Sequence, residues 1–381
     1  MYLLHQRPHL LRRGRHVDVI DTHRRRQPAS GETIRLYGEM PSGYSRHVSN
    51  GDGYELPVLP GRLQRLAEEL SEEGLPALEG APDPVVGLVE LAYALRPHAH
   101  EGRVPSYGVL LAPGPLRTLV DTTSALDTSV ELIPVHDLDI KFARRFADGV
   151  TSFAVRSDDA IDYLACFGRN MADEHDLVDL QAAVGGVIIQ RHPAGQVRVF
   201  GPAGVIRWNG TSWHHDAPLD AWIARLSSVA PDLPVDRMRP LLRFAVHRLG
   251  GRGIGATLIW RPTAHAVPLH RHEPLIHHAP RLRLNNIGEE AALAHALSQT
   301  DGAAVFDGDA TLTALAIRLA PSTVAEQTIG AFGGMRHTSA LRYSHDDPHS
   351  IVIVVSEAGP VTIMHAGIAI TEANRADERI G

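Results

Sequence analysis

Several residue types that common chemistries depend on are scarce in this chain. Its 381 residues include one cysteine, Cys166, which excludes an internal disulfide and a cysteine-based zinc cage and fits a reducing cytoplasm. Lys141 is the only lysine, and no glycine-rich loop precedes it. A Walker phosphate loop needs both features, so ordinary P-loop nucleotide chemistry is excluded.

Long apolar segments are also missing. No stretch approaches the roughly 18 apolar residues of a membrane helix, and the basic N-terminus lacks the apolar segment of a secretory signal. The chain is 44% hydrophobic and 21% charged, with a net charge of −7, which gives no general reason to expect DNA binding. We expect a cytoplasmic protein without membrane segments or a DNA module, with a flexible basic tail over residues 1–30.

The length and pattern of the chain predict two domains. Residues 31–230 contain an acidic helical stretch at 62–74, strand-like runs between 150 and 215 and a helix at 174–184, which predicts an α+β region with a mainly antiparallel sheet. Proline and small residues at 227–236 mark a boundary. We expect the second domain over residues 235–381.

The C-terminal pattern alternates helices and strands, which predicts an α/β fold with a mixed β-sheet flanked by helices. The expected elements are a helix capped by Asp236 and ending at Gly250, a strand at 255–260, a helix beginning near Asn286, a helix from Gly334 to just before Pro348, and a strand at 350–355 covered on both faces.

Two Asp-Gly pairs lie close together in this domain. Asp307-Gly308 stands between two apolar runs, the strongest short-range signal for a hairpin. Asp301-Gly302 lies instead between the end of a helix and the start of a strand, where ligands often bind in α/β folds. Asp301-Gly302 is therefore the candidate for chemistry.

A second candidate lies at the start of the helix that follows Gly334. Arg336 and His337 occupy its first turn, where free backbone N–H groups and the helix dipole favour a phosphate. The arginine fork suits phosphate oxygens, and Ser339 adds a hydroxyl. The later strand ends in a hydroxyl and a carboxylate, Ser356 and Glu357.

In order and spacing, these motifs resemble the diadenylate cyclase (DAC) domain, the module that makes cyclic di-AMP from two ATP molecules. The resemblance covers about residues 235–375. It rests on "DGA" at 301–303, "RHTSA" at 336–340, "GATLIW" at 255–260, "IRLAP" at 317–321 and "VIVVSEAG" at 352–359. The region before it is similar to sensor-type domains that precede soluble cyclases in some bacteria.

The resemblance implies a role for each matching residue. Asp301 would hold Mg²⁺ or Mn²⁺ and approach the attacking ribose 3′-hydroxyl, while Gly302 and Ala303 would let the backbone approach the nucleotide. The remaining implied catalytic and ATP-binding positions are Arg336 and His337 at the triphosphate, with Thr338, Ser339, Ser356 and Glu357, and Leu319 at the adenine. Two such domains would meet face to face, so a homodimer or higher oligomer is implied.

Two positions depart from the family pattern. Many members have Gly-Thr-Arg-His-Arg where this chain has Met335 in place of the threonine and Thr338 in place of the second arginine. The loss of a hydroxyl and a guanidinium leaves open an alternative, a nucleotide-binding sensor with the DAC fold that has lost turnover.

Three other patterns suggest further sites. His270, His272, His277 and His278 surround Glu273 with spacing that could bind zinc, as in a metalloenzyme. Asp148-Gly149 followed by Arg191-His192 loosely repeats the order of the cyclase motifs and could mark a second nucleotide pocket. "GGRGIGA" at 250–256 imitates a dinucleotide loop, but it precedes its strand, so the fingerprint fails.

Overall fold

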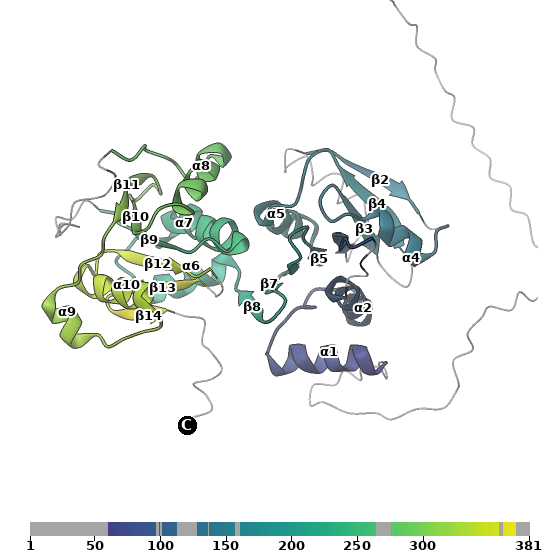
Figure 1. Ribbon diagram of the computed structural model, residues 1–381, viewed down its shortest axis with the longest axis horizontal. Coiled ribbons are helices and arrows are strands. Elements are labelled where there is room, and N and C mark those ends of the chain that lie inside the picture. The colour runs from purple at the N-terminus through teal and green to yellow at the C-terminus, as the bar shows by residue number, and fades with distance from the viewer. Residues whose placement is uncertain are drawn as a thin grey trace, which may run out of the picture. The chain divides into compact units, whose positions relative to one another are not determined.

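The computed structural model describes residues 60–96, 99, 101–112, 128–135, 137–156, 161–263, 276, 278–357 and 361–370. Two β-sheets with their own helices make up the described chain (Figure 1). None of the described helices is long and apolar enough to cross a membrane. The predicted tail at 1–30 lies outside these residues, as do His270, His272, Glu273 and His277 of the histidine cluster, so both remain predictions.

The first sheet is mainly antiparallel, as predicted. Its order is β2-β4-β3-β1-β5-β6-β7-β8, and β1–β3 is the one parallel pair among these strands. The strands are β1 Tyr107–Leu111, β2 Val130–Pro134, β3 Ser152–Arg156, β4 Ile161–Phe167, β5 Val187–Arg191, β6 Val197–Gly201, β7 Gly204–Trp208 and β8 Trp213–Asp216.

Helices cover both faces of this sheet. α1 (Gly61–Glu72) and α2 (Pro84–Leu95) pack on one face, and α5 (Glu174–Val184) packs on the other through Leu177 and Leu180. The short α4 (Ile140–Ala143) and η2 (Arg144–Phe146) precede β3. α2 begins where it does because Pro84 cannot donate a hydrogen bond and the Asp83 carboxylate accepts one from Val85 N at 2.7 Å.

The second sheet is mixed, which confirms the predicted α/β class. Its order is β11-β10-β9-β12-β13-β14, with β9 and β10 parallel and the other described neighbours antiparallel. The strands are β9 Ala256–Trp260, β10 Ala303–Phe306, β11 Leu312–Ile317, β12 Ile351–Val355, β13 Thr362–His365 and β14 Ile368–Ile370. β12 is buried along its whole length, as a strand covered on both faces must be.

Each face of the second sheet has its own helical layer. One layer contains α6 (Leu219–Val229), η3 (Val235–Met238), α7 (Arg239–Arg243), η4 (Phe244–Leu249), η5 (Gly250–Arg252) and α8 (Ile287–Leu297). The other is α10 (Met335–Asp346), with α9 (Thr323–Thr328) packed against it. α6 therefore contributes to this second core, although it comes before most of the Pro-containing segment 227–236.

The helix predicted from Asp236 to Gly250 differs from the observed one. A 3₁₀ turn begins at Val235, so Asp236 lies inside the helical segment and does not cap it. Phe244–Leu249 is π-helical, and the chain turns only at Gly253, whose φ of 65° lies in the left-handed region. π-Helical turns are rare and frequently occur at functional sites. By contrast, α8 begins next to Asn286 as predicted, and Asn286 caps it by accepting from Gly288 N at 3.0 Å.

The hairpin predicted at Asp307-Gly308 is confirmed, since β10 and β11 pair on either side of it. Its turn is longer than a two-residue turn, and the left-handed residue is Ala310, with φ 55°. The Asp307 carboxylate shapes the turn by accepting from Asp309 N and Thr311 N, at 3.1 and 3.0 Å. This Asp-Gly pair is structural.

Candidate functional site

One edge of the second sheet collects the residues that the sequence singled out. Ala303 pairs with Thr257 of β9 and with Ile317 of β11, and Thr257 pairs with Val354 of β12. The starts of β9 and β10 therefore lie beside the ends of β11 and β12. This edge carries Gly255 and Asp301 before the first two strands, and Leu319, Ser356 and Glu357 after the other two.

Gly302 has a conformation and surroundings that require glycine. Its φ is 100°, and an added Cβ would lie 2.9 Å from the carbonyl carbon of Ala316. Ala316 is itself strained, with φ 61°, where the β10–β11 register shifts. Residues held in such sparsely populated conformations cluster at ligand sites. Because Gly302 has no side chain, the backbone at the start of β10 is left uncovered.

Arg336 reaches the same edge from the start of α10. A Cβ on Gly255 would lie 2.5 Å from Arg336 Nη1 and 2.9 Å from the Cγ atom of Glu357, so both side chains lie against this glycine. Asp301 comes two residues before Ala303, whose partner Thr257 comes two residues after Gly255, so Asp301 begins β10 at the same edge of the sheet. The structure thus brings Arg336 and Glu357 together at Gly255, on the edge where Asp301 also lies.

His337 follows Arg336 in the chain and is uncharged at neutral pH. It is half-buried and packs against the ring of Phe332, with ring centroids 6.3 Å apart. Burial, and then the charge of Arg336, lower its pKa from the ordinary value of about 6.5. At neutral pH, Arg336 is therefore the charged group of the pair, and His337 offers a neutral ring nitrogen.

The two hydroxyls of the "RHTSA" motif are engaged within their own chain. Thr338 Oγ1 donates to Phe332 O and accepts from Phe332 N, both at 3.0 Å, which closes the loop before the helix. Ser339 Oγ donates to Met335 O at 2.9 Å, and its lone pairs are left for another donor. Their assignment to ATP stays a prediction, and Thr338 has a clear structural use.

This edge is suited to a polyphosphate. Arg336 supplies charge, and among the described residues no side chain caps the first turn of α10, which leaves N–H groups for an anion. The described residues contain no group of three or more His, Cys, Asp or Glu placed to hold a metal ion. Magnesium is often held by one or two carboxylates plus substrate phosphates, and Asp301 fits that arrangement.

The predicted second nucleotide site is not supported by its contacts. Asp148 accepts hydrogen bonds from Val150 N and Ser152 N, at 2.7 and 2.8 Å, and so shapes its own turn. The Arg191 side chain is buried and donates to Pro105 O and Ala94 O. Both residues serve local structure, whereas the neighbouring His192 lines a separate cavity.

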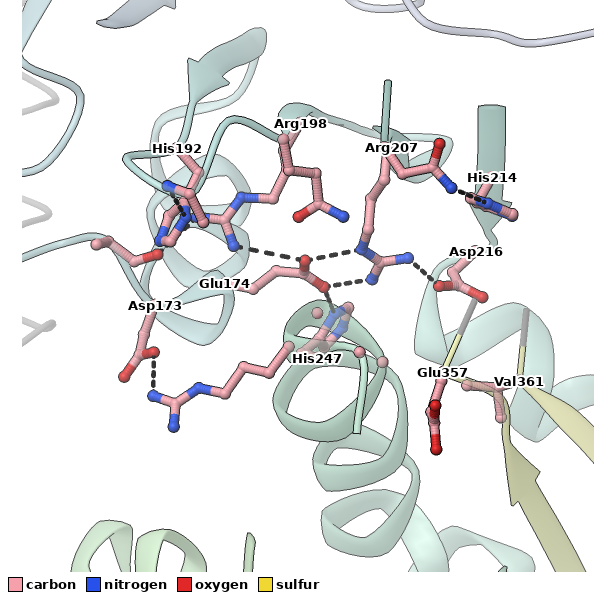
Figure 2. Close-up of a pocket in the computed structure, with 18 residues that line it drawn as sticks. Asp173, Glu174, His192, Arg198, Arg207, His214, Asp216, His247, Glu357 and Val361 are labelled. Atoms are coloured by element: carbon pink, nitrogen blue, oxygen red, sulfur yellow. Dashed lines mark hydrogen bonds and ion pairs between the residues drawn. The ribbon is translucent and has the colours of Figure 1, made fainter. Parts of the chain in front are cut away.

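That cavity is surrounded by an ionic network that sequence reasoning missed (Figure 2). Arg207 donates from Nε to Glu174 Oε2 at 2.9 Å and from Nη1 to Asp216. His247, on the π-helical turn, is 2.9 Å from Glu174 Oε1 through Nδ1. A signal was present in the sequence: Arg198 and Arg207 interrupt apolar strands, and a buried arginine needs an anionic partner.

The network holds Glu174 in its charged form. Burial alone would raise the pKa of this carboxyl, but Arg207 and His247 outweigh burial and hold it well below its usual range. An ionised carboxylate can only accept hydrogen bonds, so His247 Nδ1 carries the proton of this contact. Arg207, in turn, has its pKa raised by Glu174 and Asp216 despite its burial.

Comparison with known proteins agrees with the motifs. Residues 243–369 match the family model DAC, described as "DisA bacterial checkpoint controller nucleotide-binding". Residues 64–216 match DACNK, described as "Probable sensor domain DACNK". The second sheet thus belongs to a DAC nucleotide-binding domain, and a DACNK sensor-type domain precedes it. This confirms the resemblance that the sequence motifs carried.

Solved structures include two that resemble part of the chain. A double mutant of DacA from Staphylococcus aureus is 16% identical, covers 38% of this chain and 91% of its own, and has a TM-score of 0.26. A hypothetical membrane spanning protein from Bacillus cereus is 20% identical, with 36% and 64% coverage and a TM-score of 0.26. No curated protein matches the chain.

Proposed function

We propose that this protein is a diadenylate cyclase that condenses two ATP molecules into cyclic di-AMP and two pyrophosphates, under the control of its N-terminal sensor region. One observation carries the proposal. Within the segment that matches the DAC family, Arg336 and Glu357 lie against Gly255, on the sheet edge where β10 begins just after Asp301.

The chain's own residues supply binding and alignment. The triphosphate would lie at the start of α10, between Arg336 and the free N–H groups, with Ser356 and Ser339 beside it and Leu319 toward the adenine. In each step the ribose 3′-oxygen forms a bond to an α-phosphorus. The bond between that phosphorus and the oxygen that bridges to the β-phosphate breaks, and pyrophosphate leaves. Such in-line transfers depend mainly on positioning and on charge neutralisation.

A divalent ion fits this edge. Mg²⁺ or Mn²⁺ at the Asp301 carboxylate would neutralise phosphate charge and acidify the attacking hydroxyl. A carboxylate is by itself a weak base for a sugar hydroxyl, so holding the ion is the role that suits Asp301 best.

Ring closure needs two nucleotides that attack each other. A single edge of this kind suits one ATP, with its α-phosphorus open toward solvent at the exposed Asp301. Two copies of the domain would therefore meet face to face, each presenting one ATP to the other. A homodimer or a transient encounter of two chains would satisfy this requirement.

A turnover assay tests the proposal. The full chain, incubated with ATP and Mn²⁺ or Mg²⁺, should release pyrophosphate and cyclic di-AMP. Asp301→Ala should abolish turnover with unchanged folding, whereas Asp232→Ala, an exposed aspartate before η3, should leave it intact. Absence of product from folded, self-associating protein would refute the cyclase, and unchanged turnover in Asp301→Ala would refute the site.

A second function is favoured by two residues at the start of α10. The Met335 side chain is 89% exposed and offers no donor, and the Thr338 hydroxyl is engaged by Phe332 on both sides. Fewer donors toward the triphosphate would suit a nucleotide-binding sensor without turnover. Saturable ATP binding without product, across both metals and at high protein concentration, would support this alternative.

A further inference from the structure

The cavity of Figure 2 differs from the edge proposed for ATP, although Glu357 borders both. It has a volume of about 500 Å³, within the range of roughly 300–1,000 Å³ typical of small-molecule sites. The start of α5, strands β6–β8 and the turn Gly250–Gly253 form most of its wall, and Glu357 lies at one end. Most of its lining thus comes from the sensor-type domain.

Arg198 brings an unused donor to this cavity. Its side chain is only 4% exposed. Nε donates to Gln190 Oε1 at 2.9 Å and Nη2 to Ala172 O at 2.6 Å. Nη1 makes no hydrogen bond to any described residue, and its ion-pair contact with Glu174 Oε2 is long, at 3.8 Å. Arg198 lines the cavity, so Nη1 can donate to a ligand or to water there.

His192 brings a second donor. Its Nδ1 accepts a hydrogen bond from Ala194 N at 3.1 Å, so the ring proton of the neutral form lies on Nε2. Burial and the nearby Arg198 lower the pKa of His192 to about 4. At neutral pH the ring therefore presents a neutral N–H donor beside the Arg198 guanidinium.

Arginines and carboxylates share the wall of the cavity. The charged residues that line it are Arg198, Arg207, Arg252, Asp173, Glu174, Asp216 and Glu357. Arg207 pairs with Glu174 and Asp216, Arg198 also approaches Glu174, and Arg252 pairs with Asp173. These three carboxylates are thus each paired with an arginine, and Glu357 lies at the far end against Gly255, beside Arg336.

We propose that this cavity binds a small oxyanion, the carboxylate or phosphate group of a metabolite, between Arg198 Nη1, His192 Nε2 and the guanidinium of Arg252. An oxyanion supplies acceptors for Arg198 Nη1 and His192 Nε2 and pairs with the guanidinium groups of Arg198 and Arg252. The proposal extends the cyclase function, because it assigns a ligand class to the sensor-type domain.

The position of the cavity also gives its occupant a route to the ATP edge. A Cβ on Gly251 would lie 2.8 Å from Glu174 Oε2, one on Gly253 would lie 3.2 Å from Glu357 O, and Gly255 lies against Arg336. One short segment thus touches the cavity network at one end and the proposed triphosphate site at the other. A ligand that shifts Glu174 or Arg252 would press on this segment.

Binding to the full chain tests the inference with two probes, inorganic phosphate and succinate, by isothermal titration at constant ionic strength. At least one probe should bind at a saturable site. Binding of phosphate points to a phosphate group as the natural ligand, and binding of succinate points to a carboxylate. Arg198→Gln, His192→Ala and Arg252→Gln should each weaken binding at least tenfold. Arg225→Gln, at an exposed arginine on α6, serves as the matched control.

Phosphate could also bind at the start of α10, so the Arg336→Gln variant separates the two sites. Binding that survives in Arg336→Gln and is lost in His192→Ala or Arg252→Gln supports the cavity site, whether or not the protein turns over ATP. Three outcomes overturn the cavity site. They are binding that is lost only in Arg336→Gln, binding that is unchanged in all three cavity variants, and no saturable binding of either probe. Arg252 is partly exposed, so its variant stays informative if Arg198→Gln fails to fold.

Discussion

The Glu174 carboxylate accepts a 2.9 Å hydrogen bond from Nδ1 of His247, which joins residues 73 positions apart. Glu174 lies in the segment that matches the sensor domain, and His247 in the segment that matches the DAC domain. The contact is almost fully buried, with side chains 1% and 5% exposed. The two matched segments therefore share one desolvated ionic network.

Removing the Glu174 charge should destabilise the protein strongly. In Glu174→Gln, Arg207 keeps only Asp216 as an anionic partner and Arg198 loses its ion pair, so buried positive charge is left uncompensated. Breaking a buried pair in this way typically costs about 3–5 kcal/mol. Urea unfolding of the full chain measures the loss. Glu326→Gln, at an exposed glutamate of α9, should cost almost nothing, and equal stability of the two variants would contradict the network's role.

Stability should fall as the pH drops below about 6.5. Burial is the main cause that lowers the pKa of His175 to about 3 and that of His192 to about 4. Above pH 6.5 both rings are neutral in the folded and unfolded chains, so they add no pH dependence there. Below it, only the unfolded chain takes up these protons, until the pH reaches the folded-state values. The His175 ring then reduces the free energy of unfolding by up to about 1.4 kcal/mol per pH unit, and the more exposed His192 ring by less, because solvent screens its charge.

The variant His175→Gln checks this assignment. The His175 side chain is 13% exposed, and its buried Nε2 has no partner among the described residues. Chemical unfolding at pH 7, 6 and 5 should show a shallower decline for the variant than for the wild type. Parallel declines in the two proteins would show that other groups govern the acid sensitivity.

Gly302→Ala should damage both stability and turnover. The new Cβ would meet the Ala316 carbonyl carbon at 2.9 Å at a φ of 100°, so the start of β10 must shift, at a cost of about 1–3 kcal/mol. Gly330→Ala is the matched control, because open space surrounds Gly330 and its φ is not in the left-handed region. Thermal unfolding and ATP turnover measure the two effects. A Gly302→Ala protein as active as the control would remove the strained glycine from the site.

Gly255→Ala should affect nucleotide binding more than folding. Its Cβ would lie 2.5 Å from Arg336 Nη1, which is the far end of a flexible side chain and can move aside. The displaced guanidinium should raise the KM for ATP at least tenfold. The Tm should change by no more than about 2 °C, because a change of about 1 kcal/mol in the free energy of unfolding shifts the Tm by only a few degrees in a chain of this size. Gly288→Ala, in α8, provides a comparison with no crowded neighbour. An unchanged KM would show that Arg336 does not hold the triphosphate.

The sequence alone determined the features that depend on neighbouring residues. Asn286 caps α8, Asp307 shapes the hairpin and Gly334 precedes α10, because each of these signals acts over a few residues of backbone. The order and spacing of the cyclase motifs also carried the resemblance to the DAC family. What puts Asp301 and Gly255 on the same edge is the parallel pairing of β9 with β10, which only the folded sheet provides.

Only the tertiary structure decided where the buried charges go. In the sequence, Arg198 and Arg207 each interrupt an apolar strand, and nothing nearby shows which anion pairs with them. In the structure, the carboxylates of Glu174 on α5 and Asp216 on β8 neutralise these arginines. The structure also shows that Phe244–Leu249, which includes His247, is π-helical and that Arg198 lines a cavity. Such contacts cannot be read from local pattern, because the free energy of a buried ion depends on partners that only the folded chain brings within reach.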